Sequence, residues 1–185
     1  MFELDNPQVP IVFQPANELY CVRAEYVPLD AANPLGGVLV KNYANRGKVN
    51  GPPVGTSGAA GGSSIPGRFI GVVPDPSVPS KLSVGFALGQ SNTPVMGAPY
   101  WVVAVGPQYE WAIITGGAPN TPGTNGCTTS GPMGSTLGNS GFWFFSRKPV
   151  DPVGTAAMEA EATRLGLDTS VLLNVEQQGC TYQGA

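Results

Sequence analysis

Short runs of apolar residues recur along the chain, each bounded by glycine, proline, asparagine or serine. Runs of about four to eight residues with such boundaries are typical of β-strands. The run at 81–88 shows the strand period plainly, because Leu82, Val84 and Phe86 alternate with small residues. The pattern predicts strands at 19–27, 38–43, 68–73, 81–88, 100–105, 110–115 and 142–147, with a last extended piece at 173–177.

One segment near the end of the sequence is predicted to be helical. Asp151 is suited to cap a helix, Pro152 fits a first turn, and good helix formers continue from Ala156 to Arg164 before Gly166. Seven or eight antiparallel strands followed by one helix predict an all-β barrel or sandwich with the helix packed on its outside.

The composition suits one globular domain over residues 1–185 with long irregular loops. Hydrophobic residues make up 42% of the chain and charged residues only 11%, while 26 glycines and 19 prolines favour turns. Two segments, 51–67 and 116–141, are rich in glycine, proline, serine and threonine and are too long for hairpin turns.

Charge and hydropathy exclude several classes of function. The net charge is −3, and no basic cluster is longer than Arg147-Lys148, so nucleic acid is not expected as a partner. No apolar run reaches the ~18 to 20 residues that span a bilayer, so no transmembrane segment is predicted. Residues 1–5 lack the features of a signal peptide. We therefore expect either that a targeting segment has been removed or that the chain starts inside a longer precursor.

The three cysteines lie far apart and have no CxxC spacing, and histidine is absent. This arrangement offers no zinc site and predicts no metal centre. It favours one long-range disulfide with one leftover thiol, and hence an oxidising compartment. The alternative is a set of inert thiols in a reducing compartment. Without histidine, the common nucleophile–histidine arrangements are excluded.

Several segments, in their order along the chain, resemble the lipocalin family. The segments are CVRAEY at 21–26, VLVKN at 38–42, PSKLSVGF at 79–86, YWVVAV at 100–105, YEWA at 109–112 and FWFFSRKP at 142–149, followed by the helix and LGLDT at 165–169. The nearest likeness is to the branch of apolipoprotein D and the bacterial outer-membrane lipocalins, over approximately residues 10–180. The chain departs from the family in lacking its opening GxW motif and in having two long Gly-rich insertions.

The resemblance implies an eight-stranded, up-and-down antiparallel calycin barrel with one C-terminal α-helix packed outside. Met1 to Leu4 looks like only the tail of the first strand, so that strand is expected to be incomplete. In such a barrel the connections at 28–37, 74–80 and 106–109 share one end. The long loops 44–67 and 116–141 then surround the open mouth, either as a lid over a ligand or as a collar for protein partners.

The resemblance also implies which side chains face the interior. It places Trp143 inside the barrel, which puts Phe145 and Arg147 inward as well. The wider aromatic set includes Tyr100. The predicted ligand-binding residues are Tyr26, Val40, Asn42, Phe86, Trp111, Trp143 and Phe145. Two alternatives stay open: the interior is filled by its own side chains, and Asn42 is either an orienting hydrogen-bond group or an ordinary strand-end residue.

The family suggests roles for the cysteines and for Arg147. Cys21 pairs with Cys127 in the family pattern, which leaves Cys180 unpaired or bonded to another chain, while pairing of Cys127 with Cys180 is the competing connectivity. Arg147 has a structural role in the family, stacking on an opening-strand tryptophan that this sequence lacks. The alternative is an exposed arginine at a strand end.

These observations predict a protein that binds, carries or sequesters a small apolar molecule such as a lipid, a sterol or a carotenoid-like pigment, with no covalent cofactor. The alternative is a structural accessory subunit that docks through its mouth loops into a larger assembly, for example a membrane-associated pigment–protein complex. We expect no enzyme, although some lipocalin relatives act on carotenoids or prostaglandins through a pocket carboxylate or thiol, a role for which Cys21 or Glu25 is a candidate. The expected location is secreted, periplasmic or the lumen of an organelle such as the thylakoid.

Overall fold

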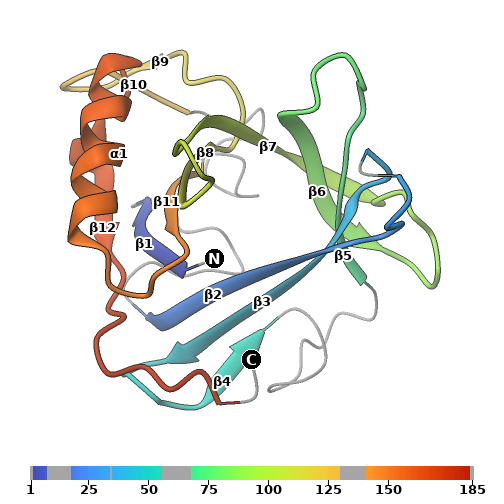
Figure 1. The fold of residues 1–185 in the computed structure, drawn as a ribbon, viewed down its shortest axis with the longest axis horizontal. Helices are drawn as coiled ribbons and strands as arrows, with labels where there is room; N and C mark the ends of the chain where they lie inside the picture. Colours follow the sequence, from blue (N-terminus) through green and yellow to red (C-terminus); the bar gives the residue numbers. More distant parts are fainter. Residues whose placement is uncertain (1, 8–17, 34, 56–67, 130–140, 184–185) are drawn as a thin grey trace.

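The structure is a computed structural model that describes residues 2–7, 18–33, 35–55, 68–129 and 141–183 (Figure 1). Its elements are β1 (Phe2–Pro7), β2 (Leu19–Pro28), β3 (Val38–Arg46), β4 (Pro53–Gly55), β5 (Arg68–Val72), β6 (Lys81–Ala87), β7 (Met96–Val105), β8 (Trp111–Thr115), β9 (Thr121–Pro122), β10 (Cys127–Thr128), β11 (Phe142–Ser146), α1 (Pro152–Arg164), the short 3-10 helix η2 (Thr169–Val171) and β12 (Leu172–Asn174). The seven strands and the helix that the sequence predicts are all present, with ends that differ by a few residues.

Eight of the described strands join edge to edge in a closed antiparallel ring. Their order is β1, β2, β3, β5, β6, β7, β8 and β11, and β11 pairs again with β1. The join between β1 and β2 is the shortest, with a single residue pair, Phe2 with Arg23. The predicted up-and-down barrel is therefore confirmed, and β1 contributes to its closure.

The C-terminal part of the chain reinforces this short join. Asp5 of β1 pairs with Phe144 of β11 and also with Asn174 of β12, so β11 and β12 lie on opposite edges of β1. Just after β12, the carbonyl of Glu176 accepts a hydrogen bond from the N–H of Cys21 in β2, at 3.0 Å. Residues 172–176 thus lie on the edge of β1 that faces β2.

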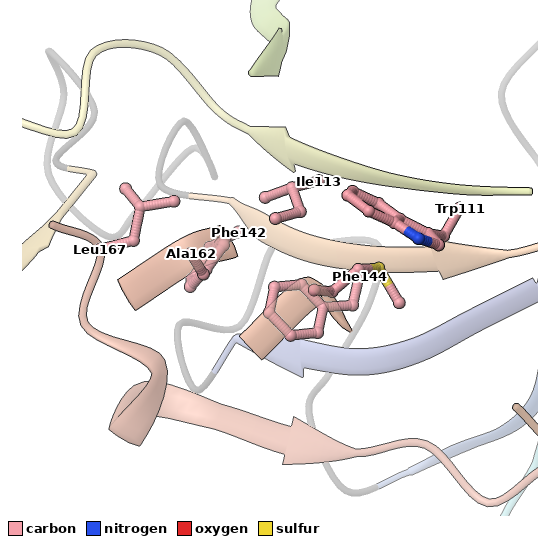
Figure 2. Close-up of a cluster of buried hydrophobic side chains, with 7 residues drawn as sticks. Trp111, Ile113, Phe142, Phe144, Ala162 and Leu167 are labelled. Atoms are coloured by element: carbon pink, nitrogen blue, oxygen red, sulfur yellow. The ribbon is translucent and has the colours of Figure 1, made fainter. Parts of the chain in front are cut away.

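The helix α1 lies outside the curve of the sheet, next to β8 and β11 (Figure 1). Asp151 caps its first turn, because its Oδ1 accepts a hydrogen bond from the N–H of Gly154 at 3.1 Å. A Cβ on Gly154 would collide with the carboxylate of Asp151, so a larger residue at this position would displace the group that caps the helix. The core between helix and sheet consists of Trp111, Ile113, Phe142, Phe144, Met158, Ala162 and Leu167 (Figure 2).

Part of the long loop 116–141 is fixed against the segment that follows α1. The N–H of Cys127 in β10 donates to the carbonyl of Gly166 at 2.8 Å, and the N–H of Asp168 donates back to Cys127 at 3.0 Å. The carboxylate of Asp168, 1% exposed, accepts a hydrogen bond from the N–H of Asn125. In loop 44–67, β4 pairs with β3. The rest of these two loops, 56–67 and 130–140, lies outside the described residues, so their role as lid or collar stays a prediction.

The disulfide joins Cys21 to Cys180, with 5.6 Å between the Cα atoms, and Cys127 is a half-buried free thiol. The prediction of one long-range disulfide and one leftover thiol is confirmed. Both predicted pairings are wrong, as is the prediction of an unpaired or intermolecular Cys180. The physical reason is that Cys127 is held beside Leu167, whereas the end of the chain returns to β2.

Residues 175–183, which we name the C-terminal strap, run from β12 along the ends of β2 and β3 to the neighbourhood of β4 (Figure 1). Gln177 Nε2 donates to the carbonyl of Val22 at 2.8 Å, and the Tyr182 hydroxyl donates to Gln177 Oε1 at 2.8 Å. Burial raises the pKa of Tyr182 to about 12, so this hydroxyl stays protonated and remains a donor at neutral pH. Cys21 itself has a positive φ of 55° and forms a bulge in β2.

Candidate functional site

A second cluster of side chains occupies the face of the sheet opposite α1, which is the interior of the ring. On β11, Trp143 and Phe145 alternate with the two phenylalanines that pack against the helix. On β8, Ala112 pairs with Phe145 and Ile114 pairs with Trp143, which places all four on one face. We name this group the lumen cluster; it consists of Ala24, Tyr26, Tyr100, Val102, Ala112, Ile114, Trp143 and Phe145.

A hydrogen bond between two tyrosines crosses the lumen. The hydroxyls of Tyr26 in β2 and Tyr100 in β7 lie 2.7 Å apart. Strands β3, β5 and β6 separate β2 from β7 along the ring, so this bond spans the interior. Trp143 of β11 stacks on Tyr100, with the ring centroids 6.3 Å apart and the planes inclined by 23°. Three aromatic rings from three strands therefore meet inside the barrel.

The register places the other predicted pocket residues on the same face. Val40 pairs with Tyr26, and Asn42 pairs with Ala24, and directly paired residues in antiparallel strands share a face. Val40 is buried and Asn42 is half-buried. On this geometry Asn42 faces the lumen, in agreement with its predicted orientation.

Phe86 of β6 lies further along the interior. It pairs with Phe69 of β5, and the two rings lie 5.0 Å apart at 52°. Leu82, four residues before Phe86 on the same strand, pairs with Tyr100. Phe86 therefore shares the face of Tyr100, and both phenylalanines are half-buried.

The structure corrects the position of Trp111. This residue packs in the cluster beneath α1 and does not face the lumen. The reason is the register of β8 and β11, in which Trp111 pairs with Ser146 while Ala112 pairs with Phe145. Since Phe145 points inward, Trp111 must point outward. Of the seven predicted pocket residues, the register therefore removes one from the interior.

Arg147 is exposed just beyond the end of β11. Its Nε donates a hydrogen bond to the carbonyl of Tyr109 at 2.7 Å, and its N–H donates to the carbonyl of Glu110 at 2.9 Å. The inward orientation that the resemblance implied is wrong, because these bonds hold Arg147 against the turn between β7 and β8. This matches the alternative of an exposed arginine at a strand end.

The sequence interpretation missed several members of the lumen cluster. Tyr100 was placed in the aromatic set but not among the pocket residues, and Val102 and Ile114 were not singled out. The signal that identifies Tyr100 is the alternation in residues 81–88, because Leu82 points inward and pairs with it. That signal requires the register between two strands, which a single sequence does not supply.

A hollow of about 360 Å³ lies elsewhere, beside the 74–80 connection on the outer face of β6 and β7. Ser83 pairs with Pro99 and Lys81 with Trp101, the positions that alternate with the inward Leu82 and Tyr100. Lys81 Nζ lies 4.2 Å from the ring centroid of Trp101, a cation–π contact. The hollow is lined by Pro74, Asp75, Val78, Lys81, Leu82, Ser83, Gly97, Pro99 and Trp101. None of these lining residues belongs to the lumen cluster.

In the described part of the chain, no group of three or more histidine, cysteine, aspartate or glutamate side chains is placed to hold a metal ion. Its helices include none that is long and apolar enough to cross a membrane.

Comparison with known proteins bears on the fold. The sequence matches no protein-family model, and it matches no curated protein. Among solved structures, the chain is similar to apocrustacyanin C2, a lipocalin, with a TM-score of 0.57 and 17% sequence identity over 98% of this chain and 78% of that chain. The chain has the lipocalin fold. At this identity the likeness establishes the lipocalin fold alone, and the nearer resemblance to the apolipoprotein D and bacterial branch stays a prediction.

Proposed function

We propose that this chain binds a small apolar molecule in the lumen of its lipocalin barrel. The observation that carries the proposal is the lumen cluster, in which aromatic and aliphatic side chains from β2, β7, β8 and β11 face one another. Sites for small molecules are typically lined by such side chains together with a few polar groups. Here the polar groups on the inner face are the two tyrosine hydroxyls and, by register, Asn42.

The exposure of the inward-facing residues also supports the proposal. On the side of β8 and β11 these residues are buried, whereas Tyr26, Asn42, Val84 and Phe86 keep part of their surface accessible although they face inward. A barrel interior filled by its own side chains would bury all of them. The partial exposure therefore favours a lumen that is packed on one side and accessible on the other.

The proposed ligands are a lipid, a sterol or a carotenoid-like pigment, held without a covalent bond and carried or sequestered. The similar solved structure is that of an apoprotein, the form of a protein without its bound group. Burial of ~400 Å² of apolar ligand surface at ~25 cal/mol/Å² contributes ~10 kcal/mol. Association costs of ~4 kcal/mol leave ~6 kcal/mol, or a Kd of tens of micromolar, and tighter binding requires well-matched contacts.

The test is a titration with a bromine-substituted fatty acid, since bromine quenches the fluorescence of a tryptophan only at close range. We expect quenching in the wild type and in Trp101→Phe and Trp111→Phe, because both of these residues lie outside the lumen. In Trp143→Phe the quenching should be lost. Native mass spectrometry of the same samples should give one ligand per chain. Quenching that survives in Trp143→Phe would place the ligand elsewhere.

A second candidate function is that of an accessory subunit in a larger assembly. The observation that favours it is the connection between β6 and β7 at the mouth end, where Leu88 and Val95 are 61% and 65% exposed. Exposed apolar side chains at such a rim suit contact with a protein partner. A purified chain that binds no apolar molecule and aggregates would favour this function over that of a carrier.

Neither proposal gives the chain a catalytic role. Cys21, one of the two candidates considered for catalysis, is held in the disulfide, and Glu25 forms an exposed ion pair with Lys41 at 3.3 Å. The disulfide fits an oxidising compartment. We propose that this compartment is extracellular, periplasmic or the lumen of an organelle. A pigment–protein complex is the proposed partner of the accessory subunit. An assay of carotenoid or lipid turnover with the purified chain should give no product.

A further inference from the structure

The Tyr26–Tyr100 bond is a polar link within an apolar wall. The side chains around it in the lumen cluster are alanine, valine, isoleucine, phenylalanine and tryptophan. Tyrosine hydroxyls in such surroundings are costly unless each has a partner, and here they are partners of each other at 2.7 Å. Two phenylalanines would provide the same rings without this cost, so the hydroxyls call for an explanation beyond packing.

We propose that this hydroxyl pair makes the lumen selective for apolar molecules that carry a hydroxyl or carbonyl oxygen, in preference to hydrocarbons of the same shape. The inference rests on the proposed function and specifies its ligand class. A ligand oxygen next to the pair can accept a hydrogen bond from one of the two hydroxyls while the Tyr26–Tyr100 bond is kept. An oxygenated ligand then makes one more hydrogen bond than a hydrocarbon does, in a lumen of low polarity.

The selectivity should be moderate, because the pair satisfies itself when no ligand oxygen is present. A binding site whose polar groups are left unpaired by the wrong ligand rejects that ligand strongly. Here a hydrocarbon leaves the Tyr26–Tyr100 bond intact, so it loses only the additional hydrogen bond, which corresponds to about a ten-fold difference in Kd. Both classes of molecule should therefore bind, with the oxygenated one favoured.

Trp143 orients one member of the pair. Its ring stacks on Tyr100, with the planes inclined by 23°, and so helps to fix the Tyr100 ring. A ligand ring that packs against these aromatic side chains can present an oxygen on its rim to Tyr26 and Tyr100. The ligand class that we propose is therefore a flat ring with a hydroxyl or carbonyl group at its edge.

The test compares 2-naphthol with 2-methylnaphthalene, which differ in a hydroxyl and a methyl group of similar size. Calorimetric titration of the wild type should give a Kd about ten-fold lower for 2-naphthol. The double variant Tyr26→Phe/Tyr100→Phe should bind both probes equally, since it has no hydroxyl. Either single variant should keep the preference, because one hydroxyl remains to bind the ligand oxygen. Tyr109→Phe, on an exposed turn, is the matched control and should behave as the wild type.

The outcomes separate this inference from the proposed function. Equal Kd values for the two probes in the wild type, or a preference that persists in the double variant, would overturn the selectivity while leaving apolar binding intact. An unchanged Kd of 2-methylnaphthalene in the double variant shows that its lumen is folded. If neither probe binds the wild type at millimolar concentration, both the selectivity and the proposed function are wrong.

Discussion

Two buried carboxylates hold separate segments of the chain together. Asp151 accepts hydrogen bonds from Gly154 N–H and, at 2.6 Å, from the Ser146 hydroxyl, so it joins the end of β11 to the start of α1. Asp168 accepts hydrogen bonds from Ser170 and from the N–H of Asn125, which fixes the 116–129 segment. These hydrogen bonds lower the pKa of both carboxyls. The largest effect comes from the Ser146 hydroxyl for Asp151 and from the Ser170 hydroxyl for Asp168.

The lowered pKa values predict a loss of stability in acid. A carboxyl whose pKa is lower in the folded state stabilises that state fully above its ordinary pKa of 3.8, and the contribution disappears as the pH falls through the folded-state value. We expect Tm to be constant between about pH 5 and 7 and to fall below about pH 4. Asp151→Asn and Asp168→Asn should show a smaller fall, measured by circular dichroism. Asp30→Asn, in an exposed turn, is the control; equal pH profiles in all four proteins would contradict the assignment.

At the scale of elements, alternation and turn residues predict most of the strands and the helix, because both depend on local sequence. β4, β9 and β10 were missed because each is only two or three residues long. The orientation of Trp111 and the pairing of Cys180 depend on register and on where the chain returns, which are non-local. The inward orientation of Trp143 and Phe145 is predicted correctly. The resemblance places Trp143 inside the barrel, and the alternation of side chains along β11 then places Phe145 on the same face.

The C-terminal strap is an element whose contribution can be measured. Its disulfide spans 159 residues, which the chain-entropy model values at about 5 kcal/mol, and measured losses are typically 2 to 5 kcal/mol. Cys21→Ser/Cys180→Ser should lower the free energy of unfolding in urea by that amount and speed hydrogen exchange in residues 175–183. Cys127→Ser, which removes no disulfide, should change either quantity little. Asn50 Nδ2 donates a hydrogen bond to the carbonyl of Gly179 in the strap, at 2.9 Å. A double variant as stable as the wild type would show that this bond and that of Gln177 suffice to hold the strap.

At the scale of the whole molecule, the two faces of the sheet carry different clusters of side chains. The outer face of β8 and β11 is covered by α1 and forms a hydrophobic core (Figure 2). The inner face carries the lumen cluster. The hydrophobic core and the proposed ligand site thus use different sets of side chains from the same two strands. Changes to the lumen should therefore alter binding more than they alter folding.

A bound ligand should stabilise the whole barrel, because the lumen exists only in the folded state. At a free concentration ten times its Kd, a ligand adds about 1.4 kcal/mol to the free energy of unfolding. For a chain of this size that raises Tm by about 3 to 6 °C. Differential scanning calorimetry at several ligand concentrations should show a logarithmic rise in the wild type. A Tm independent of ligand would mean that no binding to the folded barrel occurs.

The closure of the ring also constrains how the protein is made. β1 lies at residues 2–7, yet its partners β11 and β12 lie beyond residue 141. During synthesis, β1 cannot pair on both edges until nearly the whole chain has been made. Until then it has an exposed strand edge, and such an edge favours aggregation. Ribosome-bound chains that end before residue 142 should therefore depend on chaperones, and completed chains should not.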